Sequence, residues 1–302
     1  MKTKQFIRKE KITYKTAGKT AEYGLSFLKE NSIVNPDGTR LPYLTFPKLD
    51  QLDMIRHAMT TREGGVSTGC YESMNLSYTR GDDPAHVSEN YDRFMRVMKA
   101  PKNRVVAMDQ KHTDTVIVVT EKDAGKGVTA DLDYSYVDGA VTNEKDLPLL
   151  IFAADCVPVF FVDPVRKAIG VCHSGWRGTV KRIGRKLIRT MEKEYGTEPK
   201  DLICAIGPSI CRDCYEIGED VAGIIKREFQ GHAEEILTDD KNHLDLWTAN
   251  RIVLEEAGVP AGNIDVTDIC TYCNPDLLFS HRRSGESRGN NAGFLMLTDP
   301  AG

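Results

Sequence analysis

Two histidines and one cysteine, His112, Cys156 and His173, stand at or just after the ends of predicted strands. Side chains at strand ends meet along a shared sheet edge, so we expect the three to converge. Two imidazoles and one thiolate form a suitable ligand set for Zn²⁺, and they leave the fourth position to water or substrate, as in catalytic zinc sites. The same His₂Cys set can hold a single copper ion, which we consider the less favoured metal.

An acid, Asp155, precedes Cys156 within the apolar run that starts at Leu147. Neighbouring strand residues point to opposite faces, so Asp155 and Cys156 cannot both face a metal if the strand is regular there. Asp155 either orients a ligand imidazole or donates a proton to a leaving group, or it makes structural hydrogen bonds. A different interpretation makes Cys156 a nucleophile with His173 as its base.

Two C-x-x-C pairs lie in the C-terminal half, Cys211 with Cys214 and Cys270 with Cys273. On spacing alone these four residues fit a structural zinc site. The alternative is a set of buried or partly exposed thiols. The sequence leaves both possibilities open.

The bulk properties describe an ordinary globular chain. It has 302 residues, 40% hydrophobic and 28% charged, and a net charge of -4, so nothing favours nucleic acid or a membrane surface as a partner. The basic N-terminus lacks an apolar segment and a cleavage site, so it is not a secretory signal. The longest apolar run is too short and too polar to span a bilayer. We therefore expect a cytoplasmic protein with reduced cysteines.

Periodicity predicts the elements that position these residues. Amphipathic or capped helices are expected over 82–98, 179–196, 218–229 and 244–258, and strands over 104–120 (two segments), 137–143, 147–163, 167–175, 201–210 and 264–272. Strands and helices alternate but hairpins are mixed in, so we predict an α+β (mixed α/β) fold with mixed sheets. Residues 1–43 are expected to be an extension or hairpin region, and 44–302 a single catalytic domain.

Several motifs occur in a fixed order: TTREGGVS, GDDP, QKHTD, ADCVPV, HSGWRGT, DLWTANR and CTYC. In this order the chain, from about Leu41 onward, resembles the laccase-domain family, whose members are described as polyphenol oxidases and as purine nucleoside phosphorylases. The resemblance implies an α/β/β/α sandwich with one zinc on His112, Cys156 and His173. It does not imply a metal at the two C-x-x-C pairs.

The activity that the resemblance implies is phosphorolysis of adenosine, inosine, guanosine and methylthioadenosine, with deamination of adenosine. Zinc would lower the pKa of a bound water towards about 7, and hydroxide attack on the amino-bearing purine carbon would be deamination. The alternatives are a Cys156-dependent amidase that edits peptidoglycan precursors and, from the older family name, a copper polyphenol oxidase. The sequence contains no His-x-His pair for a multicopper centre.

The expected partners are therefore purine nucleosides and phosphate, with the oligomeric state left open. The guanidinium fork matches phosphate oxygens, and we expect Asp155, Arg177 and Cys156 to take part in catalysis. The predicted substrate-binding residues are Arg62, Asn75, Trp176, Arg282 and Arg283, of which Trp176 would stack on a purine.

Overall fold

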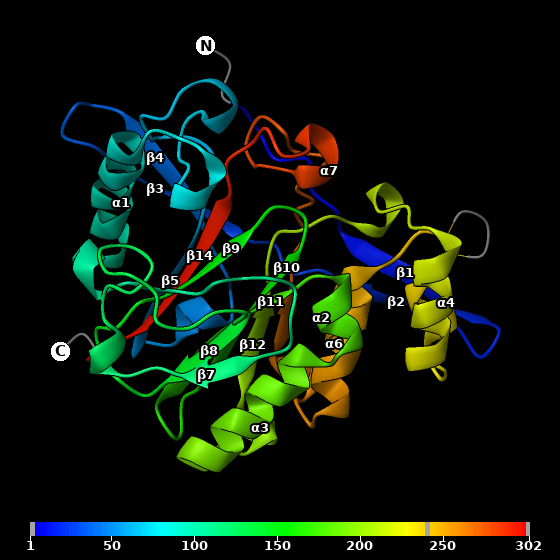
Figure 1. Cartoon of the computed structure of the whole chain (residues 1–302). Coiled ribbons are helices and arrows are strands. Elements are labelled where there is room, and N and C mark those ends of the chain that lie inside the picture. The colour runs from blue at the N-terminus through cyan, green and yellow to red at the C-terminus, as the bar shows by residue number, and fades with distance from the viewer. Residues whose placement is uncertain (1–3, 239–241, 300–302) are drawn as a thin grey trace.

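Two six-stranded mixed sheets pack face to face in the computed structural model, which describes residues 4–238 and 242–299 (Figure 1). The first sheet has the order β3 (Lys29–Val34), β4 (Arg40–Thr45), β5 (Ile55–Thr60), β14 (Asn291–Leu297), β9 (Leu149–Ala153) and β6 (Val106–Ala107). The second has the order β13 (Ile264–Val266), β12 (Ile203–Ile206), β10 (Val157–Asp163), β11 (Ala168–Ser174), β8 (Gly139–Thr142) and β7 (Val116–Val118). Both sheets are antiparallel except for the pairs β6–β9, β7–β8 and β12–β13.

Helices cover both outer faces, which confirms the predicted α/β/β/α sandwich. On the first sheet lies α1 (Pro84–Met98), and on the second lie α2 (Trp176–Val180), α3 (Ile183–Tyr195) and α6 (Leu246–Glu256) (Figure 1). The remaining α-helices are α4 (Glu219–Glu228), α5 (Ala233–Ile236) and α7 (His281–Ser284). Among the described residues no helix has the length and apolar character needed to cross a membrane.

Strand β10 shows why the sequence is continuously apolar there. Val159 and Phe161 face the helices of the second sheet, while Phe160 and Val162 face the first sheet. All seven residues of β10 are buried, because successive side chains point to opposite faces and each face is covered.

The predicted strand over 147–163 is in fact two strands in different sheets. β9 belongs to the first sheet and β10 to the second, and the chain crosses between them at residues 154–156. Asp155 has a φ of 87°, a left-handed value that a strand does not tolerate. Periodicity could not locate this break, because both halves are equally apolar.

The predicted helix over 179–196 also divides. Its first two residues belong to the end of α2, which begins earlier, at Trp176, and most of the rest forms α3; Arg182 between the two helices has a φ of 59°. The apolar face of α3 is the predicted one, with Ile183, Leu187 and Met191 buried.

Helix α1 begins as expected, with Asp83 accepting a hydrogen bond from the Ala85 N–H and Pro84 at the first helical position.

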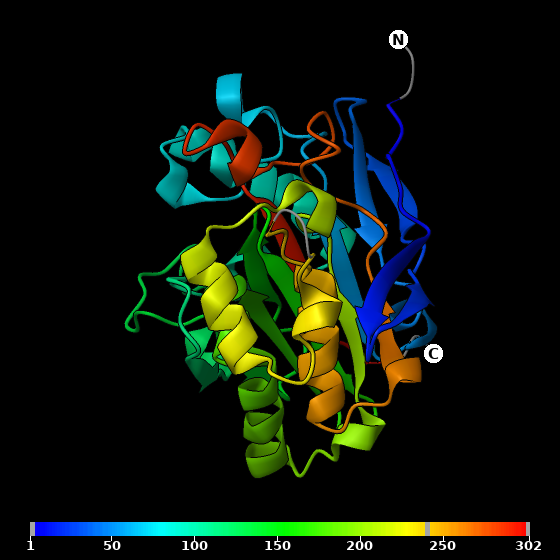
Figure 2. The same ribbon diagram turned by 90° about the vertical axis from the view of Figure 1, so that its right-hand side faces the viewer.

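The N-terminal residues form two hairpins. β1 (Lys11–Thr16) pairs with β2 (Lys19–Gly24) in a separate sheet (Figures 1 and 2). Helix α5 contacts β1. β3 and β4 form the second hairpin, and β4 pairs with β5. The predicted boundary at residues 43 and 44 thus falls inside β4, and strands on both sides of it share one sheet.

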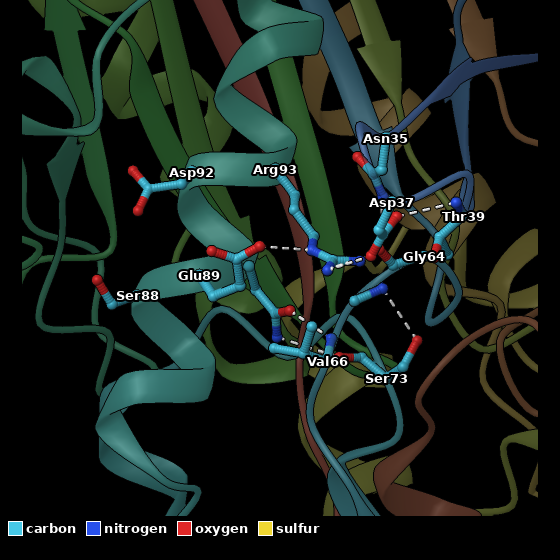
Figure 3. Close-up of polar contacts among 12 residues, drawn as sticks. Asn35, Asp37, Thr39, Gly64, Val66, Ser73, Ser88, Glu89, Asp92 and Arg93 are labelled. Carbon is cyan, nitrogen blue, oxygen red and sulfur yellow. Dashed lines mark hydrogen bonds and ion pairs between the residues drawn. The ribbon is translucent and has the colours of Figure 1, made fainter.

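Arg93 of α1 connects this second hairpin to the rest of the sandwich by hydrogen bonds (Figure 3). Its guanidinium donates to Asp37 in the β3–β4 turn at 2.6 Å, to Glu89 at 2.8 Å and to the Gly64 carbonyl at 3.3 Å. The Asn35 amide donates to the same carbonyl at 3.1 Å. The turn, the helix and the Gly64 loop are therefore held as one unit.

Candidate metal centre

His112, Cys156 and His173 come together as the sequence predicted. Their donor atoms all lie within 4.8 Å of one another, and the Cys156 sulfur is 3.7 Å from Nε2 of His112. The pairing of Pro158 with His173 across β10 and β11 sets Cys156 beside the end of β11. His112 comes from the loop between β6 and β7, where its φ of 60° turns the chain.

Asp138, just before β8, fixes two of these three residues. Its Oδ1 lies 2.8 Å from Nδ1 of His173 and accepts the His112 backbone N–H at 3.1 Å. Its Oδ2 accepts from the Lys111 and Thr113 N–H groups and from the Thr113 hydroxyl. A carboxylate on the far nitrogen of a ligating histidine sets the tautomer and the ring orientation. Nothing in the sequence pattern had singled out Asp138.

The charges of the site favour an ionised sulfur. Burial alone would raise the pKa of Cys156, but the charge of His173 and a hydrogen bond from His112 outweigh it and lower the pKa to about 6. Burial would lower the pKa of His173, yet Cys156 and Asp138 raise it to about 10. Burial would raise the pKa of Asp138, but its interactions with His173 and Thr113 outweigh burial and lower this pKa to about 2. The thiolate is the form of cysteine that binds metals.

Gly175 leaves room for the donor atoms. A Cβ at this position would lie 2.8 Å from the Cys156 sulfur and 3.1 Å from Cδ2 of His112. The glycine is thus needed for the close approach of the chain to the donor set. Together with the support from Asp138, this shows that the three residues fit one metal ion, and their His₂Cys chemistry is of the kind that suits Zn²⁺.

We expect Gly175→Ala to weaken zinc binding at this site about 10- to 100-fold, because the new methyl group displaces the sulfur or the His112 ring and so acts like the loss of a supporting contact. The measurement is competitive zinc titration with a chelator. Gly223→Ala is the control, because a Cβ there meets nothing within 4 Å. Equal zinc affinity in Gly175→Ala and the wild type would contradict the proposed role.

A cavity of about 490 Å³ adjoins the donor atoms, within the usual size range of small-molecule sites. His173 is buried, Cys156 half-buried and His112 exposed, and all three line this cavity. Apolar and aromatic side chains line part of the wall: Leu76, Tyr78, Met108, Leu132 and Phe152. Polar and charged side chains line much of the rest: Ser77, Thr79, Arg80, Asp109, Gln110, Lys111, His281, Glu286, Arg288 and Asn290.

Arg80 and Arg288 were missed by the sequence reasoning. Burial lowers the pKa of Arg288, and the positive charge of Arg80 lowers it further. Arg80 also donates to the side chain of Glu286 at 2.5 Å. Two neighbouring guanidinium groups at a cavity wall favour an anion there. The available sequence signal was the position of Arg80 directly before the GDDP segment.

The arginines that the sequence favoured do not line the cavity. Arg62 donates to the carbonyls of Glu72 and Pro275, and Arg177 lies exposed over the ring of Trp176. Trp176 packs against the helix-side core of the second sheet and is also absent from the lining. The geometry gives no support to phosphate binding by these arginines or to purine stacking on Trp176.

Arg282 and Arg283 on α7 are exposed, and each donates to a backbone carbonyl, of Glu216 and of Tyr272 respectively. Asn75 is fully buried and bonds to Ser77 and to the Asp82 carboxylate. It also accepts the backbone N–H of Asn290, which does line the cavity. Asn75 therefore supports the wall from behind.

Asp155 is engaged by three donors. Its carboxylate accepts from the hydroxyls of Thr271 and Ser280 and from the backbone N–H of Arg282. It is buried and does not line the cavity. These contacts favour the structural alternative for Asp155 over the catalytic one.

Comparisons with known proteins agree with this site and fold. The sequence model of a family described as "Multi-copper polyphenol oxidoreductase laccase" matches residues 56–298. "Purine nucleoside phosphorylase YlmD" of Bacillus subtilis is 35% identical over 243 residues, 80% of this chain and 87% of that protein. A "Purine nucleoside phosphorylase" of Bacteroides thetaiotaomicron is 35% identical over 258 residues, 84% of this chain and 96% of that protein.

Solved structures show the same architecture. The crystal structure of YlmD from Geobacillus stearothermophilus has a TM-score of 0.79 at 31% identity, covering 85% of this chain and 96% of that one. YfiH from Bacillus licheniformis has a TM-score of 0.80, also at 31% identity and with the same coverage. The chain therefore belongs to the multi-copper polyphenol oxidoreductase laccase family, and the resemblance seen in its motifs is confirmed.

Proposed function

We propose that this protein is a zinc-dependent purine nucleoside phosphorylase that also deaminates adenosine. The observation that carries the proposal is the convergence of His112, Cys156 and His173 on a cavity that also holds two arginines. The names of the relatives support the phosphorylase activity. Its substrates would be adenosine, inosine, guanosine and methylthioadenosine, and we keep the cytoplasmic location as a prediction.

His112, Cys156 and His173 would hold the zinc, and Asp138 would keep the His173 imidazole and the backbone of His112 in place. When bound, zinc supplies a Lewis acid that activates water or polarises an oxygen at neutral pH. The His₂Cys set supports a single zinc at the cavity rather than a multicopper centre. Among the described residues, the groups able to hold a metal are this His₂Cys set and a set of four cysteines, and neither has the many histidines of multicopper oxidases.

Arg80 and Arg288 would bind the phosphate. In phosphorolysis, a phosphate oxygen forms a bond to C1′ of the ribose while the bond from C1′ to N9 breaks, and its electron pair goes to the purine. The two guanidinium groups hold the phosphate and offset its charge. The leaving purine takes up a proton, and His281 at the cavity wall is an imidazole able to donate one.

The apolar side of the cavity suits the base. Phe152 and Tyr78 are aromatic residues of the wall, as are the apolar Met108 and Leu132, and a purine gains from contact with such side chains. The Gln110 side chain is tied to the backbone of Phe152 by two hydrogen bonds of 2.7 and 2.8 Å. The strand end that bears Phe152 is thereby held in place.

We expect Arg288→Ala to raise the KM for phosphate about 10-fold or more, because a hydrogen bond to a charged group contributes about 1.5–3 kcal/mol. The KM for the nucleoside should change less. Steady-state kinetics with varied phosphate measures both constants. Arg177→Ala is the matched comparison: the sequence predicted a phosphate role for Arg177, whereas its exposed position over Trp176 predicts wild-type constants. A raised KM for phosphate in Arg177→Ala, with wild-type constants in Arg288→Ala, would indicate that Arg177 binds the phosphate instead.

The low pKa of Cys156 also favours a second candidate function, the Cys156-dependent amidase acting on peptidoglycan precursors. A bound metal and a nucleophilic role compete for the same sulfur. Alkylation with iodoacetamide separates them. If the zinc-loaded protein resists alkylation at Cys156, the sulfur is a ligand; rapid alkylation of the loaded protein would favour the amidase.

Product analysis by chromatography tests the proposed function directly. Purified protein of known metal content is incubated with adenosine, with and without phosphate. When phosphate is present, we expect ribose 1-phosphate in an amount equal to the sum of adenine and hypoxanthine, because inosine formed by deamination is itself a proposed substrate. Without phosphate, we expect inosine as the product. Unchanged adenosine in both mixtures would contradict the proposal.

A further inference from the structure

We propose a second metal site, separate from the first, in which Cys211, Cys214, Cys270 and Cys273 hold one structural Zn²⁺ ion. The four cysteines belong to two C-x-x-C segments about sixty residues apart in sequence, and their sulfur atoms all lie within 4.8 Å of one another. Four cysteine ligands from two such segments are the usual ligand set of a closed, structural zinc site.

The sulfur spacing fits a single tetrahedral ion. Zn–S bonds of about 2.3 Å in a tetrahedron place the sulfurs about 3.8 Å apart, and the Cys214 and Cys273 sulfurs are 3.5 Å apart. Cys211 and Cys270 are buried, while Cys214 and Cys273 are half-buried. The group is thus nearly closed to solvent, in contrast to the first site, which opens to the cavity.

The backbone holds the two C-x-x-C segments side by side. Ser209 and Cys270 form a parallel bridge, and the Thr271 N–H donates to the Ser209 carbonyl at 3.1 Å. The Cys211 N–H points at the Cys270 sulfur, 3.3 Å away. An N–H directed at a sulfur stabilises negative charge on it. The segments are therefore arranged for four ligands before any ion binds.

Four thiolates around Zn²⁺ carry a net charge of -2, and a cation lies nearby to offset it. The ammonium group of Lys9 interacts with the charges of Cys211 and Cys273, and it donates to the side chain of Asp213, between Cys211 and Cys214, at 2.5 Å. Lys9 comes from the segment before β1. The ion would thus connect the N-terminal region to the C-terminal half.

The proposed ion would also stabilise the loops behind the first site. Asp155, which precedes Cys156, accepts from the hydroxyl of Thr271, the neighbour of Cys270. Its backbone carbonyl accepts the N–H of Ile210, the neighbour of Cys211, at 3.0 Å. Both segments that would hold the ion therefore contact the residue next to Cys156. Removal of the ion should lower the melting temperature of the whole domain.

Zinc content per chain, measured by mass spectrometry of the purified full chain, tests the proposal. We expect two zinc ions in the wild type, one in Cys214→Ser/Cys273→Ser, one in His112→Ala and none in the combined variant. Cys70→Ser is the control, because Cys70 is exposed and belongs to neither site, and it should keep two. One zinc in the wild type and none in His112→Ala would overturn the proposal.

Two measurements keep the test decisive if the double-serine variant does not fold. X-ray absorption at the zinc edge of His112→Ala, in which only the four-cysteine site remains, should show four sulfur neighbours at about 2.3 Å; nitrogen neighbours would overturn the assignment. Thiol counting in denatured, unreduced, metal-stripped protein should find all eight cysteines reactive. A disulfide between Cys214 and Cys273 would overturn it.

Discussion

Cys156→Ala is expected to remove zinc from the first site and to lower the rate of adenosine phosphorolysis by more than about 100-fold. The substitution removes the one anionic donor from a set whose two other donors are imidazoles. Loss of a residue that only supports a ligand already costs about 10–100-fold, so loss of a ligand should cost more. Zinc content and initial rates are measured on the same preparation.

The fold should survive this change, since Cys156 lies in the crossing between β9 and β10 and is half-buried. Circular dichroism checks this point. Cys70→Ser is again the control, because it removes a thiol that is exposed and belongs to neither donor set. A Cys156→Ala protein that keeps its full zinc content and full activity would show that the site is wrongly assigned.

Asp138→Asn is the second substitution with a large expected effect. Both carboxylate oxygens of Asp138 accept hydrogen bonds, from His173 and His112 on one side and from Lys111 and Thr113 on the other. An amide has only one accepting oxygen, so its NH₂ group must face donors on one side. We expect zinc affinity to fall about 10- to 100-fold and turnover to fall with it.

Asp163→Asn is the matched control for this prediction. Asp163 is fully buried and accepts the N–H groups of Val165 and Arg166 at the other end of β10 from Cys156. Both N–H groups bond to Oδ1, and the amide oxygen of asparagine can accept both, so this substitution should leave zinc affinity unchanged. If both variants bind zinc as the wild type does, Asp138 has no role in orienting the donors.

Much of the fold followed from sequence patterns because those patterns have local causes. The Asp83 cap of α1 is made within the helix itself, and the regularly spaced apolar residues of α1 pack against the sheet under it. The apolar run of β10 is buried on two faces and was predicted to be so. The crossing at residues 154–156 was not predicted, because it depends on a left-handed turn at Asp155 that its non-local partners Thr271 and Ser280 hold.

In the candidate site, too, one part was predicted from the sequence and another was not. The convergence of His112, Cys156 and His173 was predicted from strand ends and from the resemblance, and the structure brings them together. The cavity wall was not predicted. Arg80 and Arg288 are more than two hundred residues apart and meet through loops, so no local period reveals them, whereas the favoured Arg62 is engaged by backbone carbonyls outside the cavity.

The central claim is that turnover depends on the ion held by His112, Cys156 and His173. It is tested by measuring adenosine phosphorolysis in protein stripped of metal and again after zinc is returned, with His112→Ala treated in parallel. We predict a negligible rate in the stripped wild type, recovery with zinc, and no recovery in His112→Ala. A stripped wild-type protein that still splits adenosine at the full rate would contradict the claim.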